Sequence, residues 1–281
     1  MRATTESKLY QIALPVLEDM QQGALRTAFL QAFAEERESL LAIEHTFEQL
    51  TSRCYNNEAL RRFFASWSKT NHSAASVSGL ACRMTLLAAR QQDPDIARQL
   101  FKVCSSLQRI IDEDLGASGR ALHADLFYVM ATAVCGDDAW LRKSSCLQSA
   151  QEFKAWTDRQ RLRERDHFRG LIATLIHELY THSEVEFIYP LFQNWFEHHI
   201  GIPVARIRPT VAWVTVHIGG TESNHFAHAA EAVQRFSEAL NVPVAADMSM
   251  QICCEYLRRK AMVMRDCSKV LKDNETIYTI D

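Results

Sequence analysis

The chain has 281 residues, 47% of them hydrophobic, so it is long enough for one large domain or two small ones. Its 9 glycines and 6 prolines are too few for an all-β chain full of tight turns, and a net charge of −3 indicates no basic surface for nucleic acid. No apolar run reaches the roughly 18 residues of a membrane span, and the N-terminus lacks the apolar core of a secretory signal. We therefore expect a cytoplasmic protein whose partners include neither nucleic acid nor a membrane.

Apolar residues recur three and four positions apart through most of the chain, which predicts amphipathic α-helices. The first such segment covers residues 25–50, and a helix that begins at Asn71 or Ser73 runs to about Arg90. Further helices are predicted at residues 95–112, 119–134, 148–160, 164–199, 205–236 and 244–271. The breaks between them contain glycine or proline, and only residues 277–280 could form a strand.

This pattern predicts an all-α protein with a single helical domain over residues 1–281. The segments with candidate site residues lie between about residues 75 and 235, and residues 272–281 form a short tail. The eight cysteines contain no Cys-x-x-Cys pair, so we expect reduced thiols, five or more of them unreactive and buried in the core.

The first segment with possible metal ligands is an acidic cluster followed by a histidine. Asp112, Glu113 and Asp114 are consecutive, and His123 follows Glu113 by ten residues. The alternative interpretation is a helix that ends in solvated acids, followed by a helix with an ordinary core histidine.

The second segment contains a carboxylate within an apolar run. Glu186 is followed by Phe-Ile-Tyr and then by Pro190, which removes a backbone donor and can distort the helix. A lone charge in such surroundings would cost several kcal/mol if it were desolvated. Glu184 and Glu178 are competing candidates, and any of these side chains could instead face water.

The third segment contains His217, Glu222 and His225. Glu222 and His225 are three residues apart and share a helix face, whereas His217 is five and eight residues before them. On a regular helix these offsets rotate His217 roughly 80–140° away, at about 100° per residue. A π-bulge at Gly219-Gly220 would bring all three onto one face, and π-bulges often mark functional sites. Alternatively, the two glycines end one helix and start another, with the histidines exposed.

Together the three segments provide three histidines and three carboxylates, which three long helices of a bundle could bring together. Imidazole and carboxylate ligands suit iron or manganese better than a structural zinc site. Three carboxylates and two divalent ions nearly cancel in charge, whereas the acids alone would repel one another inside a bundle.

With these motifs the chain resembles the heme-oxygenase-like diiron oxidases and oxygenases, in particular the branch that includes the Chlamydia protein associating with death domains. The resemblance implies a bundle of about seven core helices without haem, two bound irons, and oxidation of a small metabolite by molecular oxygen. It also implies that the metal ligands are Glu113, His123, Glu186, His217, Glu222 and His225. The family usually has His-x-x-x-Asp/Glu-x-x-His in the last motif, so this chain has one extra residue, and Asp112 or Asp114 could replace Glu113.

The resemblance thus implies a diiron enzyme that uses O₂ on an amino acid or a similar amine in a biosynthetic pathway. The outcome could be N-oxygenation, C–C cleavage or desaturation, and a homodimer is plausible. A metal-independent enzyme of the same fold, similar to a thiaminase or a cofactor-free oxidase, is one alternative. In a special case the protein's own Tyr or Lys becomes the product. The other alternative is a non-enzymatic helical protein that binds a partner.

Overall fold

The computed structural model describes residues 6–274, apart from the side chains of Ser118, Thr221 and Glu222. Every regular element in this range is helical, as the sequence predicts. The α-helices are α1 (Lys8–Asp19), α2 (Ala24–Glu35), α3 (Arg37–Thr51), α4 (Asn57–Asn71), α5 (Ala74–Ala89), α6 (Pro94–Asp114), α7 (His123–Cys135), α8 (Gln148–Leu162), α9 (His167–Trp195), α10 (Val204–Thr210), α11 (Ala212–His217), α12 (Gly220–Leu240) and α13 (Ala246–Asp273). The possible strand at residues 277–280 lies outside the described residues.

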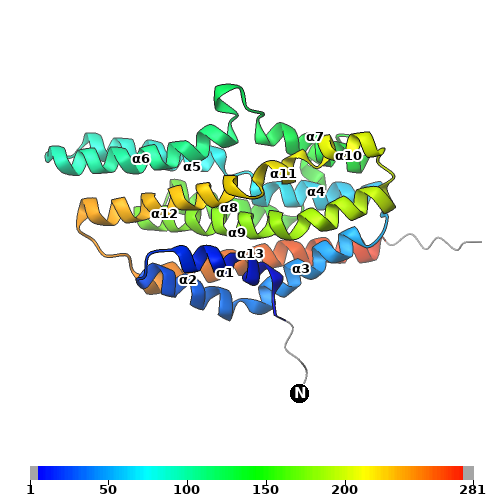
Figure 1. Ribbon diagram of the computed structural model, residues 1–281, viewed down its shortest axis with the longest axis horizontal. Helices are drawn as coiled ribbons and strands as arrows, with labels where there is room; N and C mark the ends of the chain where they lie inside the picture. Colours follow the sequence, from blue (N-terminus) through cyan, green and yellow to red (C-terminus); the bar gives the residue numbers. More distant parts are fainter. Residues whose placement is uncertain (1–5, 275–281) are drawn as a thin grey trace, which may run out of the picture.

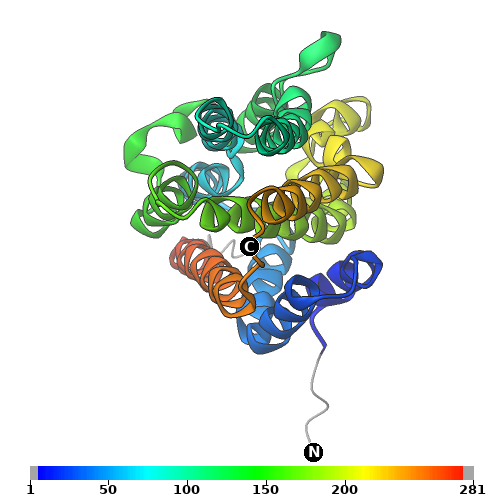
Figure 2. The same cartoon turned by 90° about the vertical axis from the view of Figure 1, so that its left-hand side faces the viewer.

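The helices form three layers that can be followed in both views (Figures 1 and 2). One outer layer contains α5, α6 and α7, the middle layer contains α8, α9 and α12, and the other outer layer contains α13 with α1, α2 and α3. The middle layer is covered on both faces, so its helices can hold polar groups away from water.

The central helix is α9, which contacts α12 and α8 within its layer and α1 and α13 in the neighbouring layer. Most of its 29 residues are buried, so its apolar side chains are not confined to one stripe. His177, Glu178 and Glu184 lie within this buried stretch. A helix that is apolar all round places its few polar residues in the interior of the protein, where they need partners.

The N-terminal half differs from the prediction in three places, and the first is α1, which lies where no helix is predicted. The segment predicted at residues 25–50 is divided at Glu36 into α2 and α3. The buried Glu36 side chain accepts a hydrogen bond from Ser39 Oγ and pairs with Arg258 of α13, and both contacts favour a bend here. No helix is predicted at residues 57–70, but the structure has α4 there. Asn56 caps this helix by accepting a hydrogen bond from the backbone N–H of Ala59.

Within residues 6–274, no helix combines the length and the apolar character that crossing a membrane requires. This includes α9, whose 29 residues contain several charged side chains.

Candidate metal centre

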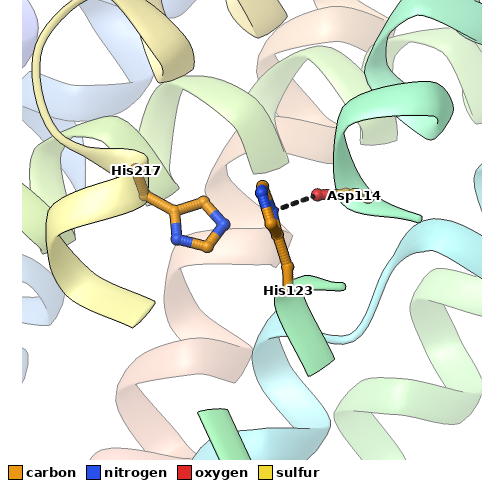
Figure 3. Close-up of side chains that lie close together, drawn as sticks. All are labelled: Asp114, His123 and His217. Carbon is orange, nitrogen blue, oxygen red and sulfur yellow. Dashed lines mark hydrogen bonds and ion pairs between the residues drawn. The ribbon is translucent and has the colours of Figure 1, made fainter. Parts of the chain in front are cut away.

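Two histidines and one aspartate meet where three helices end or begin (Figure 3). Asp114 is the last residue of α6, His123 is the first of α7, and His217 is the last of α11. His123 Nδ1 lies 3.0 Å from Asp114 Oδ1, and the rings of His123 and His217 have centroids 4.4 Å apart. One ligand atom from each residue lies within 4.8 Å of the other two, a separation that a metal ion could bridge after small side-chain shifts.

The loop between α6 and α7 returns the chain so that Asp114 faces His123. Gly116 in this loop has a φ of +68°, and a Cβ at this position would lie 2.7 Å from the carbonyl oxygen of Arg120. Glycine tolerates both the left-handed conformation and the close backbone approach. The sequence after the acidic cluster therefore fixes this return of the chain.

Next to this group, two carboxylates lie against His225 of α12. Its Nε2 lies 3.0 Å from Glu113 Oε2, and its Nδ1 lies 3.6 Å from Glu178 Oε2 of α9. The His225 side chain is 1% exposed, and Glu113 is also paired with Arg120 at 2.8 Å. Glu178 Oε1 is buried and has no hydrogen-bond partner among the described residues. The cluster is thus acidic and largely buried, and one of its buried carboxylate oxygens has no hydrogen-bond partner in the described part of the chain.

Burial and hydrogen bonding shift the pKa values of the carboxylates in this cluster in opposite directions. Burial alone would raise the pKa of Asp114, but the hydrogen bond to His123 and the charges of His225 and His217 outweigh it and hold this pKa below its usual value. The pKa of Glu113 is also lowered, because Arg120 and His225 outweigh its desolvation. Burial, with a smaller contribution from His123, lowers the pKa of His217 to about 4. At neutral pH Asp114 and Glu113 are therefore ionised and the His217 imidazole is neutral, and these are the forms that bind metal.

The three candidate carboxylates of α9 have different surroundings. Glu186 accepts a hydrogen bond from the backbone N–H of Gly219 at 2.7 Å, so it holds the start of α12. Glu184 is completely buried and pairs with Lys260. Glu178, named from the sequence only as a competitor, is the α9 carboxylate that lies beside a histidine of the cluster.

The π-bulge predicted at Gly219-Gly220 is wrong. His217 ends α11, Gly219 has a φ of +68°, and α12 begins at Gly220, so the glycines separate two helices. Ile218 is extended, which ends α11, and Gly219 has a positive φ that glycine adopts readily, so α12 starts as a new helix and no inserted residue is needed. The histidines are nevertheless buried, at 4% exposure for His217 and 1% for His225, and not exposed as the alternative interpretation supposed.

The structure therefore brings together four of the six residues that the resemblance implied as ligands, in two adjoining groups. His123 and His217 lie with Asp114, which the sequence had offered as a possible replacement for Glu113. Glu113 itself lies with His225. Glu186 bonds Gly219, and the side chain of Glu222 lies outside what the structure describes.

A cavity of about 290 Å³ adjoins the first group. Asp114, His123, His217 and Glu178 are among the residues that line it. This volume is at the lower end of the range of about 300–1,000 Å³ that is typical of small-molecule sites, so it fits a compact metabolite.

Sequence reasoning missed His177, which also lines the cavity and whose Nδ1 lies 2.9 Å from the Tyr256 hydroxyl. Burial lowers its pKa well below the usual value, so this imidazole is neutral. The available signal was a His-Glu pair within an otherwise apolar stretch of α9.

The residues present fit a metal-binding role. The cluster offers imidazole nitrogens from three histidines and oxygens from Asp114, Glu113 and Glu178. This nitrogen and oxygen donor set suits iron and manganese. The unpartnered Glu178 Oε1 is a buried acceptor of the kind that a cation would satisfy.

No protein-family model matches this chain, and no curated protein matches it significantly in sequence.

Proposed function

We propose that this protein is a non-heme diiron enzyme that uses molecular oxygen to oxidise a small metabolite, an amino acid or a similar amine. The observation that supports this most strongly is the buried cluster of His123, His217 and Asp114, next to which Glu113 and Glu178 flank His225. Five separate helices contribute these side chains, so the cluster exists only in the folded chain.

In this proposal one metal position uses Asp114, His123 and His217, and the other uses Glu113, His225 and Glu178. Two bound irons would supply the electrons that reduce O₂ and the oxidising power that acts on the substrate. The neutral His217 need lose no proton before it binds a cation, and the ionised Asp114 and Glu113 compensate the charge of the cation. Glu186 has a supporting role, because its bond to Gly219 N–H fixes the turn between His217 and His225.

Trp213 forms an apolar part of the cavity wall beside the cluster. Its ring packs against the His217 ring at a centroid distance of 4.8 Å. Trp213 also contacts Phe127 and Trp67, both completely buried. This aromatic wall excludes water from one side of the histidines and holds the His217 ring in place.

The test is an anaerobic titration of the purified chain with Fe(II), followed by measurement of bound iron. We expect about two irons per chain, and a loss of at least one in His217→Ala and in Glu178→Gln. His45→Ala is the matched control, because His45 is exposed on α3. A wild-type chain that retains no iron, or variants that bind iron as the wild type does, would exclude the proposal.

One observation favours a metal-independent enzyme as a second candidate. Asp114 orients His123 by a 3.0 Å hydrogen bond at the edge of a cavity, an arrangement that also suits a general base. Full activity after removal of all metal by a chelator would support this candidate against the diiron enzyme.

A further inference from the structure

Several polar groups that line the cavity are not used by the proposed metal chemistry. Thr181 of α9 lines the cavity and is 5% exposed, yet its Oγ1 has no hydrogen-bond partner among the described residues. Buried hydroxyls are nearly always hydrogen-bonded. An unpartnered hydroxyl on a cavity wall therefore indicates a ligand group that is to be bound there.

The N-terminus of α5 opens onto the same cavity. Ala74 and Ala75, the first two residues of this 16-residue helix, line it, as does Ser73 before them. Ser73 makes no side-chain hydrogen bond to the helix. The first amides of an α-helix have no partner within the helix, and the helix dipole makes this end favourable for an anion.

Lys154 of α8 adds a full positive charge. It is the only lysine or arginine among the described residues that line the cavity. Its ammonium group also pairs with Asp158, one turn further along α8, which does not line the cavity. Lys154 therefore brings a positive charge to the cavity wall, and its ammonium group is held by a carboxylate that does not line the cavity.

We infer that Thr181, Lys154 and the N-terminus of α5 form an anion subsite that binds the carboxylate of the substrate. The rest of the substrate then extends toward Asp114, His123 and His217, which line the same cavity. This inference rests on the proposed function and narrows it: the substrate is an amino acid or another small carboxylic acid, and not a simple amine. A bound cation favours this arrangement, because the acidic side chains of Asp114 and Glu178 line the same cavity.

The experiment uses the full chain loaded anaerobically with Fe(II), with bound iron measured first. The proteinogenic amino acids and their methyl esters are then tested for binding by calorimetry. An ester keeps the amine and the side chain but removes the carboxylate charge. We expect at least one amino acid to bind, and its methyl ester to bind roughly tenfold more weakly or worse, as expected for the loss of a charge-assisted hydrogen bond.

Two variants test the subsite itself. Lys154→Met and Thr181→Val should each weaken binding of that amino acid about tenfold while the iron content stays at the wild-type level. Asp158→Asn is the matched control near the subsite, because it removes the partner of Lys154 and leaves the cavity wall intact; binding should be unchanged or tighter. Lys102→Met, on the exposed face of α6, controls for the change in net charge.

The possible results separate the two proposals. If iron binds but no amino acid does, or if the ester and both variants bind as tightly as the acid and the wild type, the anion subsite is wrong while the metal centre stands. If no iron binds, the diiron function is wrong, and the anion subsite is wrong with it, because the subsite needs a bound cation to offset Asp114 and Glu178.

Discussion

Lys260 and Glu184 form an ion pair in which both side chains are completely buried, with Nζ 2.9 Å from Oε2. Trp67 Nε1 donates to the same carboxylate at 2.9 Å, and Lys260 Nζ donates to Thr70 Oγ1 at 2.7 Å. Tyr180 provides a further donor to Glu184. Burying two charges costs several kcal/mol, and such a pair is tolerated only when its remaining hydrogen-bonding atoms are satisfied, as they are here.

Removal of the lysine should therefore destabilise the fold strongly. In Lys260→Met the Glu184 carboxylate stays buried without its counter-charge, and we expect the free energy of unfolding to fall by about 3–5 kcal/mol. Denaturant unfolding monitored by circular dichroism measures this. Adding Glu184→Gln should recover part of the loss, and Lys269→Met, in an exposed pair with Asp266, should change little. Equal stability of Lys260→Met and the wild type would contradict this account.

The cysteines differ in environment, which gives a second prediction at this scale. Cys135, Cys253, Cys254 and Cys267 are buried, fewer than the five or more expected from the sequence, while Cys54 and Cys82 are exposed. Burial raises the pKa of Cys135 and of Cys267 to about 12 and that of Cys254 to about 11, so these thiols stay protonated at pH 8. Iodoacetamide at pH 8 should modify Cys54 and Cys82 first, as read by peptide mass spectrometry. Cys267 should react only after denaturation, and its modification at the rate of Cys82 would show that the core is open.

At the scale of elements, the loop between α6 and α7 determines whether Asp114 meets His123. Gly116→Ala would introduce both an unfavourable positive φ and a clash with the Arg120 carbonyl group, so we expect a loss of roughly 1–3 kcal/mol in stability and weaker metal binding. Gly119→Ala is the matched comparison, because Gly119 has a φ of +81° but open space around its Cβ position. Thermal unfolding and iron content measure the two effects. A Gly119→Ala variant as damaged as Gly116→Ala would show that the close approach is unimportant.

For the whole molecule, metal binding and folding should be linked. A metal that binds the native chain at a free concentration one hundred times its Kd stabilises it by about 2.7 kcal/mol, which corresponds to an increase in Tm on the order of 5 °C for a chain of this size. We expect this increase with Fe(II) under anaerobic conditions, and its reversal by a chelator. His217→Ala should show little of it, whereas His45→Ala should respond as the wild type does.

Much of the architecture could be predicted from the sequence, because the periodicity of apolar residues identifies helices and glycine or proline marks several of their ends. The division at Glu36 could not, because it depends on the contact with Arg258, more than two hundred residues away. The choice among Glu178, Glu184 and Glu186 was open for a related reason. Since α9 is apolar on every side, its sequence has no polar face that would show which carboxylate is directed at the histidines.

Asp114 and Glu113 illustrate the same limit at the site. They are adjacent at the end of α6 and pair with different histidines, and this division of roles depends on where α7 and α12 lie. The sequence could indicate the acidic cluster and His123, but the pairing is a property of the tertiary structure.

The position of α9 between the layers has a consequence for communication across the protein. His177 lines the cavity and bonds Tyr256 of α13, while Glu184, less than two turns further along α9, pairs with Lys260 of the same helix. Filling the cavity should therefore slow amide exchange along the middle of α13, although no α13 residue lines that cavity. The C-terminal helix would then report on the occupancy of a pocket that it does not touch.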